Sequence, residues 1–186
     1  MKIKKLLERA EHNFEEGFLE EAIADFNEVI ELDPTCWDAY ESRGVVYREL
    51  DLNDNKNHNL KSPLKELYFA TCDLERAIDL TDNPETKAML HIELSYINSV
   101  YGEFCDSAIN ASIAISLNPN NAIGYTRRAI SLLGLEDYDG SLADAKKALE
   151  IEPNQPEALI LVKAMNPIQK EESYLQNIVL KNEINL

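Results

Sequence analysis

The chain has 186 residues, of which 45% are hydrophobic and 28% are charged, and its formal net charge is −16. This composition is typical of a globular protein, and the length suits one domain or one short repeat array. Nucleic acid and anionic lipid are poor partners for so acidic a chain, because phosphate binding needs a basic surface. The charge favours basic peptides or basic patches on proteins, although acidity that serves only solubility is an open alternative.

The cysteines and the N-terminus favour a cytoplasmic protein. Cys36, Cys72 and Cys105 are widely spaced and form no C-x-x-C motif, which predicts reduced thiols. The opening stretch MKIKKLLERAEHNFEE reaches Glu8 and Glu11 before the apolar region of a signal peptide could form. No stretch of 18 apolar residues occurs, so we expect neither an export signal nor a membrane span.

A phrase of small and apolar residues recurs along the chain, and it closes each time on Leu or Ile, an acidic or Asn residue, and Pro. Pro119 and Pro153 are 34 residues apart, whereas Pro34 and Pro119 are 85 apart, which is two such periods plus 17 residues. The period predicts a repeat array with a further unit between the first two phrases. The phrases are AIADFNEVIELDP from Ala22, SAINASIAISLNP from Ser107 and SLADAKKALEIEP from Ser141.

In chain order, apolar spacing and the period predict four units of two helices each, at 3–36, 37–84, 88–121 and 122–155. In the second unit, helices at 37–50 and 64–80 flank a polar, Asn-rich insert near 51–64. We expect this insert to be an exposed loop, because Asn and Asp favour turns. Two helices cannot bury their apolar faces alone, so the units are expected to stack.

The C-terminal part continues the helical pattern. Pro156 is suited to a first helical position, and the following residues predict a cap helix at 156–166. The repeat array is therefore expected to span residues 1–167. Residues 168–186 are expected to form a second cap helix or a mobile tail.

The units resemble the tetratricopeptide repeat, whose 34-residue pattern is W-x2-L-G-x2-Y, then A-x3-F, then P. The first unit departs from it at Arg9, Ala10 and Asn13, and the third at Ser95 and Asn98. The resemblance implies an all-α solenoid, a right-handed superhelix whose first helices line a concave, peptide-binding groove. The matching residues are Ala22, Phe26 and Pro34; Tyr40, Gly44 and Tyr47; Leu94, Gly102, Phe104, Ala114 and Pro119; and Tyr125, Tyr138, Ala148 and Pro153.

Helical spacing places one stripe of each first helix on that groove, and the stripe is acidic in its N-terminal half and apolar with one Arg in its C-terminal half. This predicts a peptide ligand with Lys or Arg at one end and apolar side chains at the other. Glu15, Ser42 and Arg48 belong to the same stripe. The candidate partner-binding residues are Leu7, Glu8, Glu11, Phe14, Glu41, Val45, Met89, Ile92, Glu93, Tyr96, Ile123, Arg127 and Ile130.

Two alternatives stay open for this stripe. The acidic residues also fit an ordinary solvated face, and the apolar stripe of the third unit also fits core packing. Some members of the family hold the acidic tail of heat-shock chaperones with Lys, Asn and Arg. Because only Arg127 fits that clamp, we expect no binding of such tails. The positions compared are Leu7, Glu11, Ser42, Met89 and Glu93, or, with the frame shifted by one unit, Glu41, Val45, Glu93, Ile123 and Arg127.

The sequence gives little support for a catalytic site or a metal site. Asp51, Asn53 and Asn55 alternate as in a calcium loop, but Lys56 and Ser62 stand where such a loop needs Gly and Glu. The three histidines have no metal-ligand spacing, and no phosphate loop or nucleophile motif occurs. We expect a scaffold without catalysis, cofactor or metal. The alternatives are a self-associating module, and a regulatory subunit acting through the insert.

Overall fold

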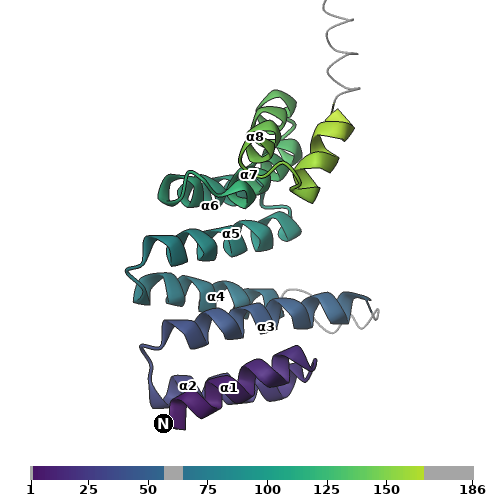
Figure 1. The fold of residues 1–186 in the computed structure, drawn as a ribbon. Helices are drawn as coiled ribbons and strands as arrows, with labels where there is room; N and C mark the ends of the chain where they lie inside the picture. The colour runs from purple at the N-terminus through teal and green to yellow at the C-terminus, as the bar shows by residue number, and fades with distance from the viewer. Residues whose placement is uncertain (1, 57–64, 166–186) are drawn as a thin grey trace, which may run out of the picture. The chain divides into compact units, whose positions relative to one another are not determined.

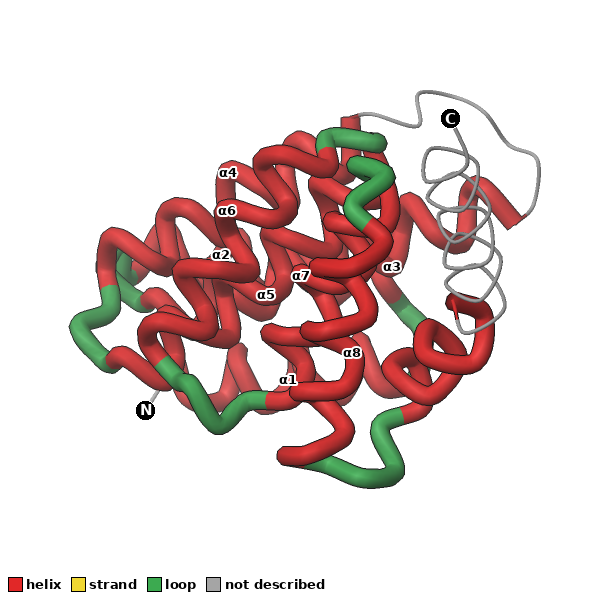
Figure 2. Tube along the Cα trace, turned by 90° about the horizontal axis from the view of Figure 1, so that it is seen from above, coloured by secondary structure: helices red, strands yellow, loops and turns green. Residues whose placement is uncertain are grey.

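Within residues 2–56 and 65–165, which a computed structural model of the protein describes, the chain is made of helices joined by short turns, with no strand (Figures 1 and 2). The predicted all-α fold is confirmed. An unlabelled helix at 156–165 follows the last labelled one. The labelled helices are α1 (Lys2–Glu15), α2 (Leu19–Leu32), α3 (Trp37–Lys56), α4 (Lys65–Leu80), α5 (Pro84–Tyr101), α6 (Phe104–Leu117), α7 (Ala122–Gly134) and α8 (Tyr138–Ile151).

The helices fall into two compact units, residues 1–97 and residues 98–186, whose boundary lies inside α5. In the N-terminal unit α1 packs on α2, α2 on α3 and α3 on α4. In the C-terminal unit α6 packs on α7 and α7 on α8. Within each unit these consecutive helices therefore pack on one another, which is the arrangement of stacked helical hairpins.

The beginning of the insert is helical, contrary to the expected loop. Helix α3 continues six residues past Leu50, because no Gly or Pro interrupts residues 51–56. Asp51 is only 2% exposed. A helical backbone over residues 51–56 also differs from the loop conformation of a calcium site. Residues 57–64 lie outside the described part of the chain, as do residues 168–186 of the expected second cap or tail.

Helix α5 begins four residues earlier than the period of 34 predicts. The side chain of Asn83 accepts hydrogen bonds from the backbone amides of Glu85 at 2.9 Å and Thr86 at 3.2 Å. Pro84 then occupies the first helical position, where its missing amide hydrogen costs nothing. An Asn cap followed by Pro is a local start signal, and here it prevails over the repeat period.

Small residues lie where paired helices cross. Ala22, Ala70, Ser107 and Ser141 are each fully buried. At Gly44 the approach is close enough that an added Cβ would lie 3.2 Å from the backbone oxygen of Ala70. The first and second helices of a hairpin can therefore pack with their backbones in near contact.

A bidentate ion pair joins the two helices of three hairpins. An Arg at the seventh position of the repeat donates from Nε and Nη2 to an Asp on the second helix. In all three, the Asp side chain is largely buried. Paired, hydrogen-bonded burial is the condition under which a charge is tolerated in a core. The pairs are Arg9 with Asp25, Arg43 with Asp73, and Arg128 with Asp144.

In two of these hairpins the Arg also reaches the preceding second helix. Arg43 donates from Nη1 to Oδ1 of Asn27, and its guanidinium lies 5.6 Å from the ring centroid of Tyr40. Arg128 repeats the arrangement, with Ser112 at 3.4 Å as acceptor and Tyr125 at 5.8 Å as ring. One guanidinium thus links three helices in each case.

The third repeat has Leu94 and Asn110 at the corresponding positions, which cannot form the pair. Leu94 is 4% exposed, so an apolar side chain replaces the cation in the core. Ser95, which departs from the repeat pattern, is also fully buried.

Replacing Asp73 by Ala should lower the free energy of unfolding by about 3–5 kcal/mol, because it leaves a buried guanidinium without its carboxylate. The Arg43 side chain is only 17% exposed. Asp25→Ala should cost less, since the side chain of Arg9 is 58% exposed and water can solvate it. Urea unfolding followed by circular dichroism measures both. Asp79→Ala, at an exposed position of α4, serves as the control. Equal losses at Asp73 and Asp79 would contradict the role of the pair.

Candidate functional site

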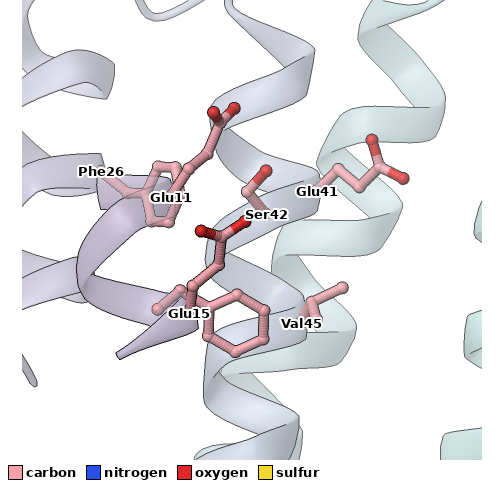
Figure 3. Close-up of a pocket in the computed structure, with 7 residues that line it drawn as sticks. Glu11, Glu15, Phe26, Glu41, Ser42 and Val45 are labelled. Atoms are coloured by element: carbon pink, nitrogen blue, oxygen red, sulfur yellow. The ribbon is translucent and has the colours of Figure 1, made fainter. Parts of the chain in front are cut away.

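A hollow of about 390 Å³ lies in the N-terminal unit (Figure 3). Helices α1 and α3 provide most of its lining, and α2 contributes one aromatic ring. The residues that line it are Glu11, Phe14, Glu15, Phe26, Glu41, Ser42 and Val45. We call this hollow the α1–α3 pocket.

Helical spacing brings these side chains to one place. Glu11, Phe14 and Glu15 follow one another at intervals of three and one, so they share a face of α1. Ser42 and Val45, three residues apart, do the same on α3. Phe26 is 1% exposed and belongs to the core of the unit. The pocket therefore has an apolar base under a polar rim.

The rim is acidic. Among the described residues that line the pocket are three carboxylates and no Lys, Arg or His. Glu11 and Glu15 are exposed, whereas Glu41 is half-buried. Burial raises the pKa of Glu41 above its usual value, and the nearby charges of Asp38 and Glu93 raise it further. A cation in the pocket would relieve this repulsion.

Arg48 compensates part of the acidic stripe from within the protein. Its guanidinium pairs with Glu93 on α5 and, at 3.2 Å, with Glu49. It also lies 5.4 Å from the ring centroid of Tyr96. The Arg48 side chain is 19% exposed. Glu93 is thus engaged, whereas Glu11 and Glu15 of the α1–α3 pocket are exposed.

The structure brings four candidate residues together in the pocket, and these are Glu11, Phe14, Glu41 and Val45. Near the start of α1, Leu7 packs against the core, and exposed Glu8 pairs with Lys4 at 3.7 Å. On α5, Met89 is 58% exposed, but Ile92 is only 7% exposed and offers little surface.

The remaining candidates belong to the C-terminal unit. Ile123 is 41% exposed, and Ile130 packs partly against the core there. Arg127, expected to be the cation of the stripe, forms an ion pair at 3.4 Å with Glu157 of the 156–165 helix. A partner carboxylate would therefore compete with Glu157 for Arg127.

Sequence reasoning did not assign Glu15, Ser42, Phe26 or Arg48 to the site. Glu15, Ser42 and Arg48 belong to the predicted stripe, so helical spacing alone could have indicated these three residues. Phe26 carries no such signal, because its place in the repeat pattern identifies it as a core residue. The pairing of Arg48 with Glu93 joins residues 45 positions apart, which local spacing cannot predict.

Neither a metal site nor a membrane span emerges from residues 2–56 and 65–165. No group of three or more His, Cys, Asp or Glu residues is arranged there to hold a metal ion. No helix in these ranges has both the length and the apolar character needed to cross a bilayer.

Comparison with known proteins finds relatives that contain tetratricopeptide repeats. The sequence profile of the tetratricopeptide repeat matches residues 13–36. Human tetratricopeptide repeat protein 13 is 29% identical over 145 residues, which are 77% of this chain and 15% of that protein. The STIP1 homolog of Dictyostelium discoideum is 49% identical over 41 residues, which are 22% of this chain and 7% of that protein. The chain thus spans a small part of these relatives.

Solved structures share the fold at low sequence identity. MamA from Desulfovibrio magneticus RS-1 has a TM-score of 0.73 at 14% identity, with 97% of this chain and 92% of that chain covered. A thermophilic tetratricopeptide protein of Thermus thermophilus has a TM-score of 0.67 at 20% identity, with 88% and 80% covered. The matched profile and the relatives support assigning the chain to the tetratricopeptide repeat family, and the solved structures share its fold.

Proposed function

We propose that this protein is a non-catalytic scaffold that holds a segment of a partner protein, and that the α1–α3 pocket receives a Lys or Arg side chain of that segment. Proteins of the family generally mediate protein–protein interactions. The observation that carries the proposal is a pocket lined by three carboxylates and by Phe14, Phe26 and Val45.

Such a lining suits the two parts of a basic side chain. The aliphatic stem of Lys or Arg can lie against the apolar base while its charged head remains at the carboxylates of the rim. Each exposed ion pair stabilises a complex only weakly, so the charges mainly speed encounter and set the register of the segment. The apolar contacts then contribute much of the affinity.

The apolar end of the segment is proposed to contact Met89 on α5, which is exposed and lies one turn before Glu93. Ile123 and Ile130 remain candidate contacts of the C-terminal unit in their own right. Acidic peptides should bind poorly, because they would add negative charge beside Glu41, whose pKa is already raised by burial and by the charges of Asp38 and Glu93.

The double change Glu11→Gln and Glu15→Gln should weaken binding of a synthetic peptide with two adjacent Lys at one end and Leu and Ile at the other. We expect a loss of roughly three- to tenfold at low salt, because exposed charge pairs are worth about 0.2–1 kcal/mol each. Fluorescence anisotropy measures the affinity. The control, Glu20→Gln with Glu31→Gln on exposed positions of α2, removes the same charge away from the pocket. Equal affinity of wild type for acidic and basic peptides, or binding that ignores salt, would overturn the proposal.

Glu41→Gln should change stability and binding in opposite directions. The raised pKa means that the folded protein disfavours the ionised form, so stability from protonated Glu41 is lost as pH rises through the raised pKa. At neutral pH the amide avoids this cost, and the unfolding free energy should increase. The same change should weaken binding of the basic peptide. Wild type should gain affinity for this peptide as Glu41 ionises, and the variant should show a smaller gain. Thermal unfolding and anisotropy across pH test both, and weaker stability with unchanged binding would contradict the assignment.

Arg48→Gln should free Glu93 and shift peptide preference towards sequences with an additional Lys. Arg48→Lys keeps the cation beside Glu93 and should leave the ranking of peptides nearly unchanged. A peptide array with graded Lys content compares the three proteins, and circular dichroism confirms that each is folded. The same ranking for wild type and Arg48→Gln would show that Arg48 does not limit access to Glu93.

A further inference from the structure

The α1–α3 pocket has an equivalent one repeat further along the N-terminal unit, where α3 faces α5. There the side chain of Arg48 pairs with Glu49 and Glu93 and lies 5.4 Å from the ring centroid of Tyr96. The protein thus places a guanidinium of its own between carboxylates and an aromatic ring. We call these four residues the Arg48 cluster.

The repeat period relates the pocket to this cluster residue by residue. A position in the first repeat corresponds to one 34 residues later in the second, and a position in the second to one 51 residues later in the third, because the second repeat carries the insert. Four residues that line the pocket are in this way the equivalents of the Arg48 cluster. The pairs are Phe14 and Arg48, Glu15 and Glu49, Ser42 and Glu93, and Val45 and Tyr96.

The pocket differs from the cluster at the position of the cation. Phe14 stands in place of the arginine, whereas Glu15 keeps the carboxylate of its equivalent. Glu11 on α1 and Glu41 on α3 provide two further carboxylates (Figure 3). The ion pairs between described residues include none of these three carboxylates. The pocket therefore offers carboxylates and a ring to a cation that no described residue provides there.

We propose that the α1–α3 pocket selects the guanidinium of an Arg side chain over the ammonium of Lys, so that an Arg of the partner takes the role that Arg48 has one repeat later. This inference rests on the proposed peptide-binding function and narrows its ligand from either basic residue to Arg. A planar fork with five donors can reach carboxylates on two helices at once, whereas an ammonium is a compact point charge. A guanidinium is also more weakly hydrated, so it is less costly to place beside half-buried Glu41 and the ring of Phe14.

The protein itself uses the two kinds of cation differently. Like Arg48, Arg43 and Arg128 each combine a carboxylate partner with an aromatic ring, at 5.6 and 5.8 Å from the ring centroid. In all three cases the cation placed between a carboxylate and a ring is an Arg. The Lys ion pairs of the described part of the chain have exposed side chains on both partners, as in Lys4 with Glu8. The surroundings that the pocket provides are thus those in which this fold places Arg.

Three matched peptides compared on wild type by fluorescence anisotropy test the proposal. They share the Leu and Ile end described above and carry two Lys, two Arg or two citrulline residues at the other end, and citrulline keeps the shape of Arg without its charge. The Arg peptide should bind roughly three- to tenfold more tightly than the Lys peptide, because a ring contact and a second hydrogen-bonded carboxylate add to the charge. The citrulline peptide should bind most weakly.

The outcomes separate this inference from the proposed function. Equal affinity for the Lys and Arg peptides, both above citrulline, would overturn the selectivity and leave the peptide-binding function intact. Tighter binding of the Lys peptide would do the same. Equal affinity for all three peptides would overturn both, since the pocket would then not recognise a cation.

Phe14→Arg provides a second test, because it supplies a guanidinium from α1 as Arg48 does from α3. This variant should bind the Arg peptide at least about tenfold more weakly, since the pocket would already hold a cation. The control Phe18→Arg, at a 55% exposed position in the turn after α1, adds the same charge outside the pocket and should change the affinity little. The same affinity in both variants would overturn the proposal.

Phe14→Leu tests the contribution of the ring. It keeps an apolar base without an aromatic face, so the ratio of Arg to Lys affinity should fall towards one. An unchanged ratio would contradict the ring contact. Circular dichroism confirms that each variant is folded, and the comparison of peptides on wild type decides the proposal without any variant.

Discussion

The bidentate contact between an Arg of one helix and a buried Asp of the next sets the geometry on which the other features depend. Arg43 and Asp73 show it most fully, because the same guanidinium also reaches Asn27 and stacks on the ring of Tyr40. A planar fork with fixed donors leaves little freedom in how the three helices slide past one another. Small residues at the crossings, such as Gly44, then allow the helices to pack at the distance that the fork requires.

Because Arg side chains are held in ion pairs within the fold, fewer cations remain to balance the carboxylates of the surface. The chain has only 18 Lys and Arg residues against 34 Asp and Glu. Several of the Arg residues are held in pairs, either inside hairpins or, like Arg48 and Arg127, with Glu93 and Glu157. The first-helix surface of the N-terminal unit therefore retains carboxylates beside an apolar base, as at Glu11 and Glu15. An excess of negative charge that the core does not compensate thus remains on this surface.

The amino-acid sequence was sufficient to predict the all-α fold, the period of 34 residues and the face of α1 and α3 that carries Glu11, Phe14, Glu41 and Val45, because helical periodicity and turn residues are local properties. It also contained the reason that α3 continues through Asp51, since no Gly or Pro interrupts residues 51–56. It did not indicate that Phe26 would line the pocket, that Arg48 would pair with Glu93 or that Arg127 would pair with Glu157. The tertiary structure decided these three features, because each joins side chains of separate helices, and the local spacing of residues carries no information about which distant side chain lies opposite.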